Sequence, residues 1–191
     1  AAAKHKMPAV ALTDAGNMMG VFHFIDSIDA HNKKIEKSGE GNPILGIIGC
    51  EFNICENHTN KDYKDNGYQV VLLAKNKNGY QNLVKMSSIS YTDGFYYVPR
   101  IDREVLKQYK DDIIVLSGGI NGEVSSKILN IGERHAEGAL QWWKAEFGED
   151  FYVEILRHGQ EDENRVNELL VPMAQRNRVK LIAANNTFYI D

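Results

Sequence analysis

Short apolar segments rich in β-branched residues alternate along the chain with longer segments of helical periodicity. The apolar segments predict β-strands, because such runs bounded by polar or glycine-containing turns are typical of buried strands. The predicted strands are residues 9–13, 44–54, 69–74, 112–117, 151–156 and 179–184. The longer segments repeat apolar residues every three or four positions and predict helices at 17–37, 77–90, 103–109, 122–129, 132–146 and 161–176.

This alternation predicts one α/β domain built on a parallel sheet, interrupted by a solvated loop at the polar residues 56–67. Two parallel architectures are open. A doubly wound dinucleotide-binding sheet requires Gly-x-Gly-x-x-Gly after its first strand, and residues 14–20 lack that spacing. The glycines at 118–122 could cradle a phosphate, although a plain strand-to-helix turn is the preferred interpretation. The alternative architecture is a (β/α) barrel.

The distribution of polar residues favours the barrel. In or just after the C-terminal parts of five predicted strands lie Asp14, Glu51, Ser117, Glu154, Arg157, His158, Asn185 and Asn186. In (β/α) barrels this end of the strands carries the functional site. Polar residues also gather at strand ends because loops begin there. Their coincidence at several strands favours a site.

Composition, charge and cysteine spacing exclude several classes of protein. The chain has 191 residues, of which 43% are hydrophobic and 25% charged, so it has enough apolar residues for a packed core. Lys and Arg number 22 and Asp and Glu 26, a net charge of −4, which disfavours a domain that binds nucleic acid by itself. Cys50 and Cys55 lack Cys-x-x-Cys spacing, which predicts no structural zinc and a reducing, cytoplasmic compartment.

Five motifs carry a family resemblance. They read MPAVALTDAGNMMG at 7–20, IIGCEF at 47–52, LLAKNKNGYQNL at 72–83, LSGGINGEV at 116–124 and LIAANNTFY at 181–189. In type and order they resemble the PHP (polymerase and histidinol phosphatase) domain of the alpha subunit of bacterial DNA polymerase III. The resemblance covers nearly the whole chain, which makes it far more specific than any single glycine motif.

The resemblance implies a distorted (β/α)7 barrel of the TIM type, formed by residues 1–191 as one PHP domain fragment. The family's first strand and its His-x-His motif would precede Ala1. We therefore expect an incomplete barrel, with the apolar residues at 9–12 and 179–182 poorly covered. The resemblance also implies that the rest of the polymerase alpha chain is the main partner. Replisome subunits such as a sliding clamp or a proofreading exonuclease would join it, DNA would bind through other domains, and no membrane contact is expected.

Metal-dependent members of this family hold about three metal ions with His, Asp, Glu and sometimes Cys. The corresponding positions here are Ala15, Glu51, Gln69, Gly119, Asn186 and Phe188. Glu51 is therefore the only retained ligand position. Asp14, Arg157 and His158 complete the predicted remnant cleft. Arg157 could supply positive charge in place of metal, or it could simply be solvated, and His158 is interpreted as a hydrogen-bonded structural residue.

These positions predict no metal, no cofactor and no catalytic residue in this chain. The predicted function is a non-catalytic scaffold within a DNA-directed DNA polymerase. The alternative is a metal-dependent phosphoesterase, such as a 3′–5′ exonuclease or a pyrophosphatase. The sequence FYYVPR at 95–100 could stack on bases, but the acidic residues that follow it favour a packed aromatic turn.

Overall fold

The computed structural model describes residues 1–185 and residue 187. Its elements are β1 (Ala9–Leu12), α1 (Val21–Ser38), β2 (Leu45–Cys55), β3 (Tyr68–Ala74), α2 (Lys77–Thr92), β4 (Ile101–Asp102), α3 (Arg103–Gln108), β5 (Ile113–Leu116), α4 (Glu123–Asn130), α5 (Glu133–Phe147), a 3-10 turn η1 (Gly148–Asp150), β6 (Phe151–Ile155), α6 (Glu161–Arg176) and β7 (Lys180–Ala183). Every strand and helix predicted from the sequence is present. The short β4 and η1 were not predicted.

Side chains fix several helix boundaries. The side chain of Asn76 accepts hydrogen bonds from two backbone N–H groups of the first turn of α2, and Asp102 does the same for α3. Both caps satisfy donors that the start of a helix leaves unpaired. Helix α1 ends at Gly39, whose φ of 69° lies in the left-handed region that favours glycine.

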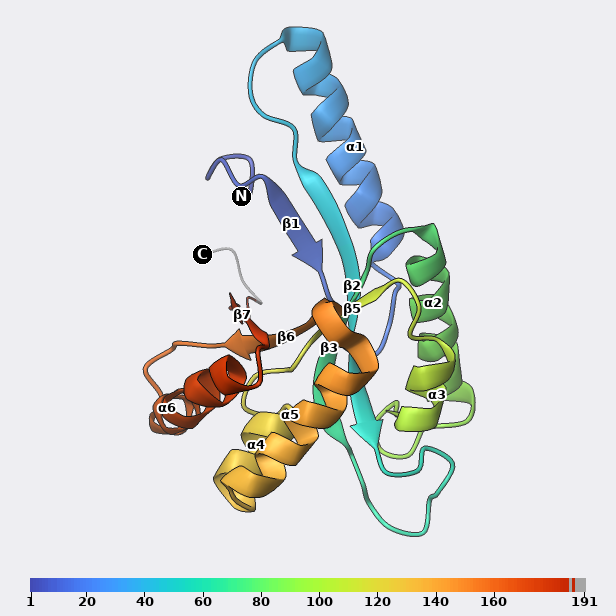
Figure 1. Cartoon of the computed structure of the whole chain (residues 1–191). Helices are drawn as coiled ribbons and strands as arrows, with labels where there is room; N and C mark the ends of the chain where they lie inside the picture. Colours follow the sequence, from blue (N-terminus) through green and yellow to red (C-terminus); the bar gives the residue numbers. More distant parts are fainter. Residues whose placement is uncertain (186, 188–191) are drawn as a thin grey trace.

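The strands form one curled sheet in the order β1-β2-β3-β5-β6-β7, with β4 paired to the end of β2 (Figure 1). The prediction of an all-parallel sheet is wrong for β3, which runs antiparallel to both β2 and β5. The reason is the connection at residues 56–67. It has no helix to carry the chain back along the sheet, so β3 starts at the edge where β2 stops.

The sheet is open. Strands β1 and β7 are at its two ends and do not pair with each other in the described part of the chain. The expectation of poor cover at 179–182 is confirmed for Leu181 and Ile182, which are exposed, and is wrong for Val179, which is buried just before β7. The structure is thus a mixed α/β fold with a half-barrel sheet, which agrees with the expectation of an incomplete barrel. No helix among residues 1–185 is both long and apolar enough to cross a membrane.

Alternation along the strands divides the residues between two faces. One face packs under the helices and forms the core, which includes Cys50, Phe52, Val70, Leu72, Val115 and Val153. Successive side chains of a strand point to opposite faces, so the intervening residues face the hollow of the curled sheet. Both cysteines are buried and unbridged. Because the core occupies the face under the helices, the inner face is the one that can carry a functional site.

Arg100 holds the 56–67 loop in place. Its side chain is 1% exposed and donates hydrogen bonds to the backbone carbonyls of Gly94 (3.0 Å), Asp65 (2.8 Å), Asn60 (2.9 Å) and His58 (3.3 Å). No base could therefore reach its guanidinium. Arg100 instead joins the loop to the turn that precedes β4.

Candidate functional site

The inner face of the curled sheet encloses a cavity of about 360 Å³. It is lined by alternate residues of the strands and by the loop after β5, including Ala11, Thr13, Ile47, Glu51, Gln69, Val71, Leu73, Leu116, Gly119, Asn121, Glu154, Leu156, Ile182 and Asn185. Gln69 lies at the start of β3, yet it shares the polar end of the cavity with residues from the ends of β2 and β6. The antiparallel direction of β3 explains this placement, because Gln69 pairs with Asn53 near the end of β2.

Glu51 projects into this cavity from the last half of β2. Its backbone is fixed on both sides, since its N–H donates to the carbonyl of Asp14 at 3.1 Å and its carbonyl accepts from Gly16 at 2.8 Å. Burial raises the pKa of its carboxyl. Neither carboxyl oxygen forms a hydrogen bond with the residues that the structure describes. Glu51 is thus a positioned but unpaired acid.

Glu154 on β6 is the second acid of the cavity. It is buried, and its Oε2 has no hydrogen-bond partner among the described residues. Burial raises the pKa of its carboxyl, and the negative charge of Glu51 raises it further. Two carboxyls in one poorly solvated cavity disfavour double ionisation. The pair therefore favours a protonated state or an added cation.

The other polar groups of the cavity are neutral. Gln69, Asn121 and Asn185 line it, and Gln69 donates its backbone N–H to the carbonyl of Asn121 at 3.1 Å. Carboxyl and amide oxygens suit a hard cation such as Mg²⁺ better than zinc, which prefers nitrogen and sulfur ligands. Nowhere in the described residues do three His, Cys, Asp or Glu side chains converge as metal ligands.

Two predicted cleft residues occupy contrasting places. The side chain of Asp14 does not line the cavity; its Oδ2 lies so close to Gly20 that a Cβ there would approach it to 2.9 Å. It sits beside the N-terminus of α1, where a negative charge is favourable. Gly119 does line the cavity, and Leu156 fills the space next to it, since a Cβ at Gly119 would lie 2.4 Å from the Leu156 Cδ1 atom.

Arg157 and His158 follow β6, outside the cavity lining. Arg157 is exposed, so the structure places no guanidinium next to Glu51. The ring of His158 lies between Oε1 of Glu163 (2.6 Å) and Oδ1 of Asn185 (2.7 Å). The contacts with Asn185 and Glu163 raise the pKa of His158. The ring is hydrogen-bonded, as its interpretation from the sequence expects, and it links the first turn of α6 to the residues after β7.

Asn186 and Phe188, the remaining predicted site residues, lie outside the described residues. Glu154, which the sequence predicts as a polar residue at a strand end but not as part of the remnant metal-ligand cleft, lines the cavity. The available signal was a glutamate at an inward position of an otherwise apolar strand, Phe-Tyr-Val-Glu-Ile. Charged residues are rarely buried without a partner, so this position was itself an indication of a site.

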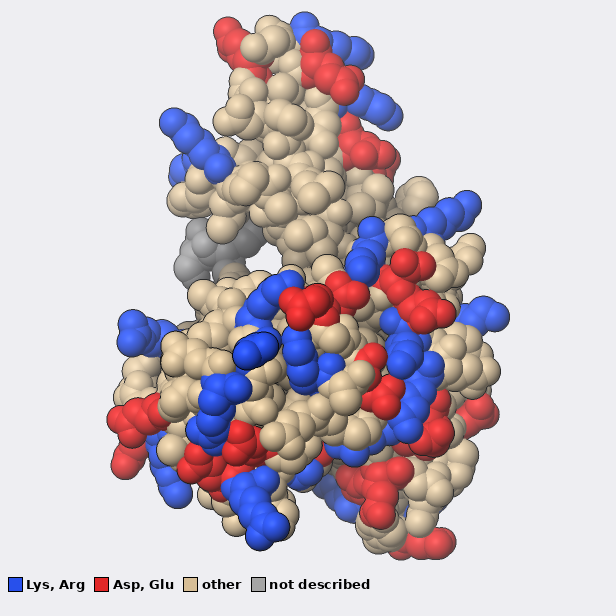
Figure 2. Space-filling model, in the orientation of Figure 1, with Lys and Arg blue, Asp and Glu red and all other residues tan. Residues whose placement is uncertain are grey.

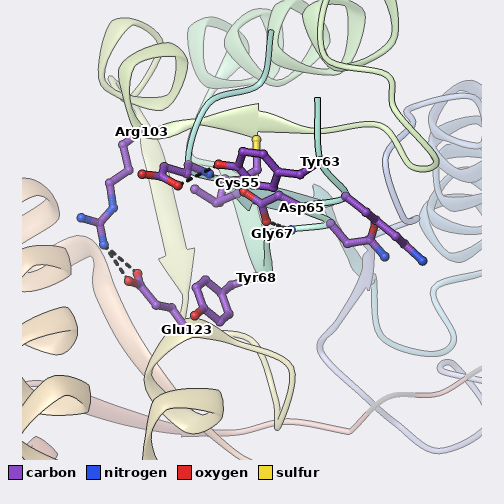
Figure 3. Close-up of a pocket in the computed structure, with 11 residues that line it drawn as sticks. Cys55, Tyr63, Asp65, Gly67, Tyr68, Arg103 and Glu123 are labelled. Carbon is purple, nitrogen blue, oxygen red and sulfur yellow. Dashed lines mark hydrogen bonds and ion pairs between the residues drawn. The ribbon is translucent and has the colours of Figure 1, made fainter. Parts of the chain in front are cut away.

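A larger cavity, about 620 Å³, lies between the 56–67 loop and the starts of α3 and α4. Figure 3 shows Arg103 and Glu123 pointing toward each other at its border, joined by hydrogen bonds of 2.8 Å. The lining groups pair among themselves, since Tyr63 donates to Glu56 and Asp65 accepts from the backbone N–H of Gly67. This cavity contains none of the predicted site residues, and its hydrogen bonds hold the 56–67 loop together and join α3 to α4.

The model of the PHP domain family matches residues 1–158. This chain belongs to the PHP domain family. It is 39% identical over 194 residues to the DNA polymerase III subunit alpha of Borreliella burgdorferi, covering 100% of this chain and 16% of the relative. It is 35% identical to the Campylobacter jejuni protein of that name and 36% to that of Treponema pallidum, covering 95% and 96% of this chain and 15% of each relative. The chain thus spans only about a sixth of these relatives.

The side chains that the structure describes in this PHP domain do not fit a multinuclear metal centre. Several cations held close together repel one another and need several anionic ligands, whereas the described part of the cavity offers the carboxyls of Glu51 and Glu154. The cysteines do not add to them, because burial raises the pKa of Cys50 to about 12 and that of Cys55 to about 11. Both thiols are protonated at neutral pH; Cys50 belongs to the core, and the buried Cys55 donates to the carbonyl of Ile101 at 3.3 Å.

Proposed function

We propose that this PHP domain is a non-catalytic scaffold of the alpha chain of a replicative DNA polymerase. The similarity to polymerase III alpha subunits places the proposal in DNA replication. The cavity supports the absence of hydrolysis, because its described lining offers amides, glycines and apolar side chains beside two carboxyls. Amide groups keep hydrogen-bonding capacity but bind metal ions weakly. No cofactor is part of this proposal.

The second candidate is a metal-dependent phosphoesterase. The specific observation in its favour is the pair Glu51 and Glu154, two acids of raised pKa in one cavity. A single hard cation bridged by both carboxyls would relieve their repulsion and could activate a water molecule against a phosphoester. Such a centre would need both acids.

The experiment measures hydrolysis by the complete polymerase chain. Purified polymerase is incubated with single-stranded DNA and with a chromogenic phosphodiester in the presence of Mg²⁺, Mn²⁺ or Zn²⁺. The scaffold proposal expects no hydrolysis that depends on Glu51, and equal primer extension by wild type, Glu51→Gln and the control Glu104→Gln, an exposed acid of α3. Metal-dependent cleavage that is lost in Glu51→Gln and in Glu154→Gln, but kept in Glu104→Gln, would establish the phosphoesterase instead.

The scaffold proposal carries further expectations about the complete polymerase. A closed, seven-stranded barrel would form from the half-barrel sheet together with chain outside the described residues. The rest of the alpha chain would be the permanent partner, and a sliding clamp and a proofreading exonuclease would be partners of the assembly. Primer–template DNA would bind through other domains, as the net charge of −4 supports, and the assembly would work in the bacterial cytoplasm.

A further inference from the structure

An apolar groove runs between α1, the first half of β2 and the start of α2, on the outside of the half-barrel. It consists of two adjoining hollows of about 310 and 370 Å³, and Tyr80 of α2 lines both. Helix α1 and the start of β2 project beyond the rest of the molecule (Figure 1). On the face seen in Figure 2, this projecting part is mostly uncharged below its charged tip. We call these two hollows the α1–α2 groove.

Large apolar side chains border this groove. Phe22 on α1 is 76% exposed, and Leu45 at the start of β2 is 64% exposed. Met19, in the turn that precedes α1, is exposed as well, although it lines neither hollow. Single exposed apolar residues are common, but Phe22 and Leu45 line two adjoining hollows, which indicates a surface that another molecule or segment covers.

The groove also contains an unpaired strand edge. Strand β3 pairs with β2 from Gly49 onward, whereas Leu45–Ile48 pair only with β1. The other edge of Leu45–Ile48 has no strand partner anywhere in the described residues. Unpaired backbone donors and acceptors beside apolar side chains are a template for a further segment of chain.

The two hollows of the groove carry opposite charges. Asp26 and Asp29 of α1 line one hollow, and Lys77 at the start of α2 lines the other. A segment that fits the groove would carry apolar residues in its centre, a basic residue toward α1 and an acidic residue toward α2. Such an arrangement favours one orientation of the bound segment over its reverse.

We propose that the α1–α2 groove is the surface on which the remainder of the polymerase alpha chain packs against this domain. The inference rests on the proposed function, and it names the surface through which this domain would contact the rest of the alpha chain. The relatives are about six times as long as this chain, so most of their polypeptide lies outside the PHP domain. A covalently linked segment has a high effective concentration, so even a small groove is occupied by it in preference to a separate protein.

The test uses cysteine labelling in the full-length polymerase chain. Phe22→Cys is compared with Ile131→Cys, a matched control that is 55% exposed just after α4 and lines neither hollow. Maleimide modification at each site is followed by peptide mass spectrometry. Without a covering segment, Phe22→Cys reacts at least as fast as Ile131→Cys. If the groove is open in only about a tenth of the molecules, Phe22→Cys should react about tenfold more slowly than in an open groove.

A second pair of variants separates docking from misfolding. Reversing the acidic wall with Asp26→Lys and Asp29→Lys should restore fast labelling at Phe22→Cys and leave the rate at Ile131→Cys unchanged. Equal rates at Phe22→Cys and Ile131→Cys in the full-length chain at low concentration would overturn the proposal. Slow labelling that appears only at high concentration, or only after another replisome protein is added, would also overturn it in favour of a second copy or a separate subunit. The scaffold proposal is judged separately, by hydrolysis and primer extension.

Discussion

Replacing Glu154 with glutamine should stabilise the folded chain at neutral pH. The Glu154 carboxyl is buried, its Oε2 has no hydrogen-bond partner in the described residues, and it shares its cavity with Glu51. Glutamine has nearly the same shape, carries no charge and adds an N–H donor next to the Glu51 acid. An unsatisfied buried polar group costs about 1–3 kcal/mol, so we expect the free energy of unfolding to rise by about 1–2 kcal/mol.

The gain should depend on pH in a defined direction. Because the pKa of Glu154 in the folded state is raised above its ordinary value of 4.5, the folded chain binds this proton more tightly than the unfolded chain. Glu154 therefore favours folding below pH 4.5, and this contribution is lost as the pH rises through the folded-state pKa. The advantage of Glu154→Gln should be largest near about pH 8 and nearly vanish near about pH 4.

Urea unfolding followed by tryptophan fluorescence measures this difference, with Trp142 and Trp143 as probes. The control is Glu104→Gln, which removes an exposed acid paired only with Lys107 and should change stability little. A Glu154→Gln chain that is less stable than wild type at pH 8 would refute the reasoning. An advantage that does not change with pH would refute it as well.

Three further predictions concern other parts of the molecule. Arg100→Met should lower the free energy of unfolding by about 2–4 kcal/mol, because four backbone carbonyls lose their donor; a loss below about 1 kcal/mol in urea unfolding would contradict this. The contacts with Asn185 and Glu163 raise the pKa of His158, so its charged form favours folding below pH 6.5 and that contribution is lost as the pH rises through the folded-state pKa. Glu163→Gln should therefore return the His158 pKa, measured by NMR titration of its ring, toward 6.5. Finally, a chain of net charge −4 should bind duplex DNA weakly in fluorescence anisotropy, and submicromolar binding at physiological salt would contradict this.

The hydrophobic pattern predicted the elements well but not the direction of β3. Periodicity reports which residues share a face, and it is the same for parallel and antiparallel strands. The direction depends on the connection at residues 56–67, which contains no helix and therefore returns the chain antiparallel to β2. An antiparallel β3 is what brings Gln69 to the polar end of the cavity.

The role of Arg100 could not be predicted from local sequence. Its acceptors are four backbone carbonyls from two separate turns, and no sequence pattern records where a carbonyl points. An arginine beside three aromatic residues resembles an exposed nucleic-acid contact. Only the folded loop shows that the guanidinium is enclosed, and that it holds the segment that turns the chain into β3.

Within the site, the family motif identified Glu51, whereas Glu154 was predicted only as one of several polar residues at strand ends, and the fold is what places it beside Glu51 in one cavity. The motif GCEF marks one position on one strand. That Glu154 shares the cavity with Glu51 depends on the curl of the sheet across β3 and β5, which brings strands far apart in the sheet order around one hollow. Site residues that meet through curvature are not visible in a single-strand pattern.

The same pair of acids decides between the two candidate functions. If the cavity binds no cation, Glu51 and Glu154 lower the free energy of unfolding at neutral pH. Mg²⁺ or Mn²⁺ should then leave the extra stability of Glu154→Gln unchanged. If the pair binds a cation, the metal should stabilise the wild-type chain by RT ln(1 + [M]/Kd) and leave the variant unaffected, because a ligand stabilises only the state that binds it. The advantage of the variant would then shrink or reverse as metal is added. Stability measured against metal concentration therefore tests the scaffold proposal without requiring any substrate.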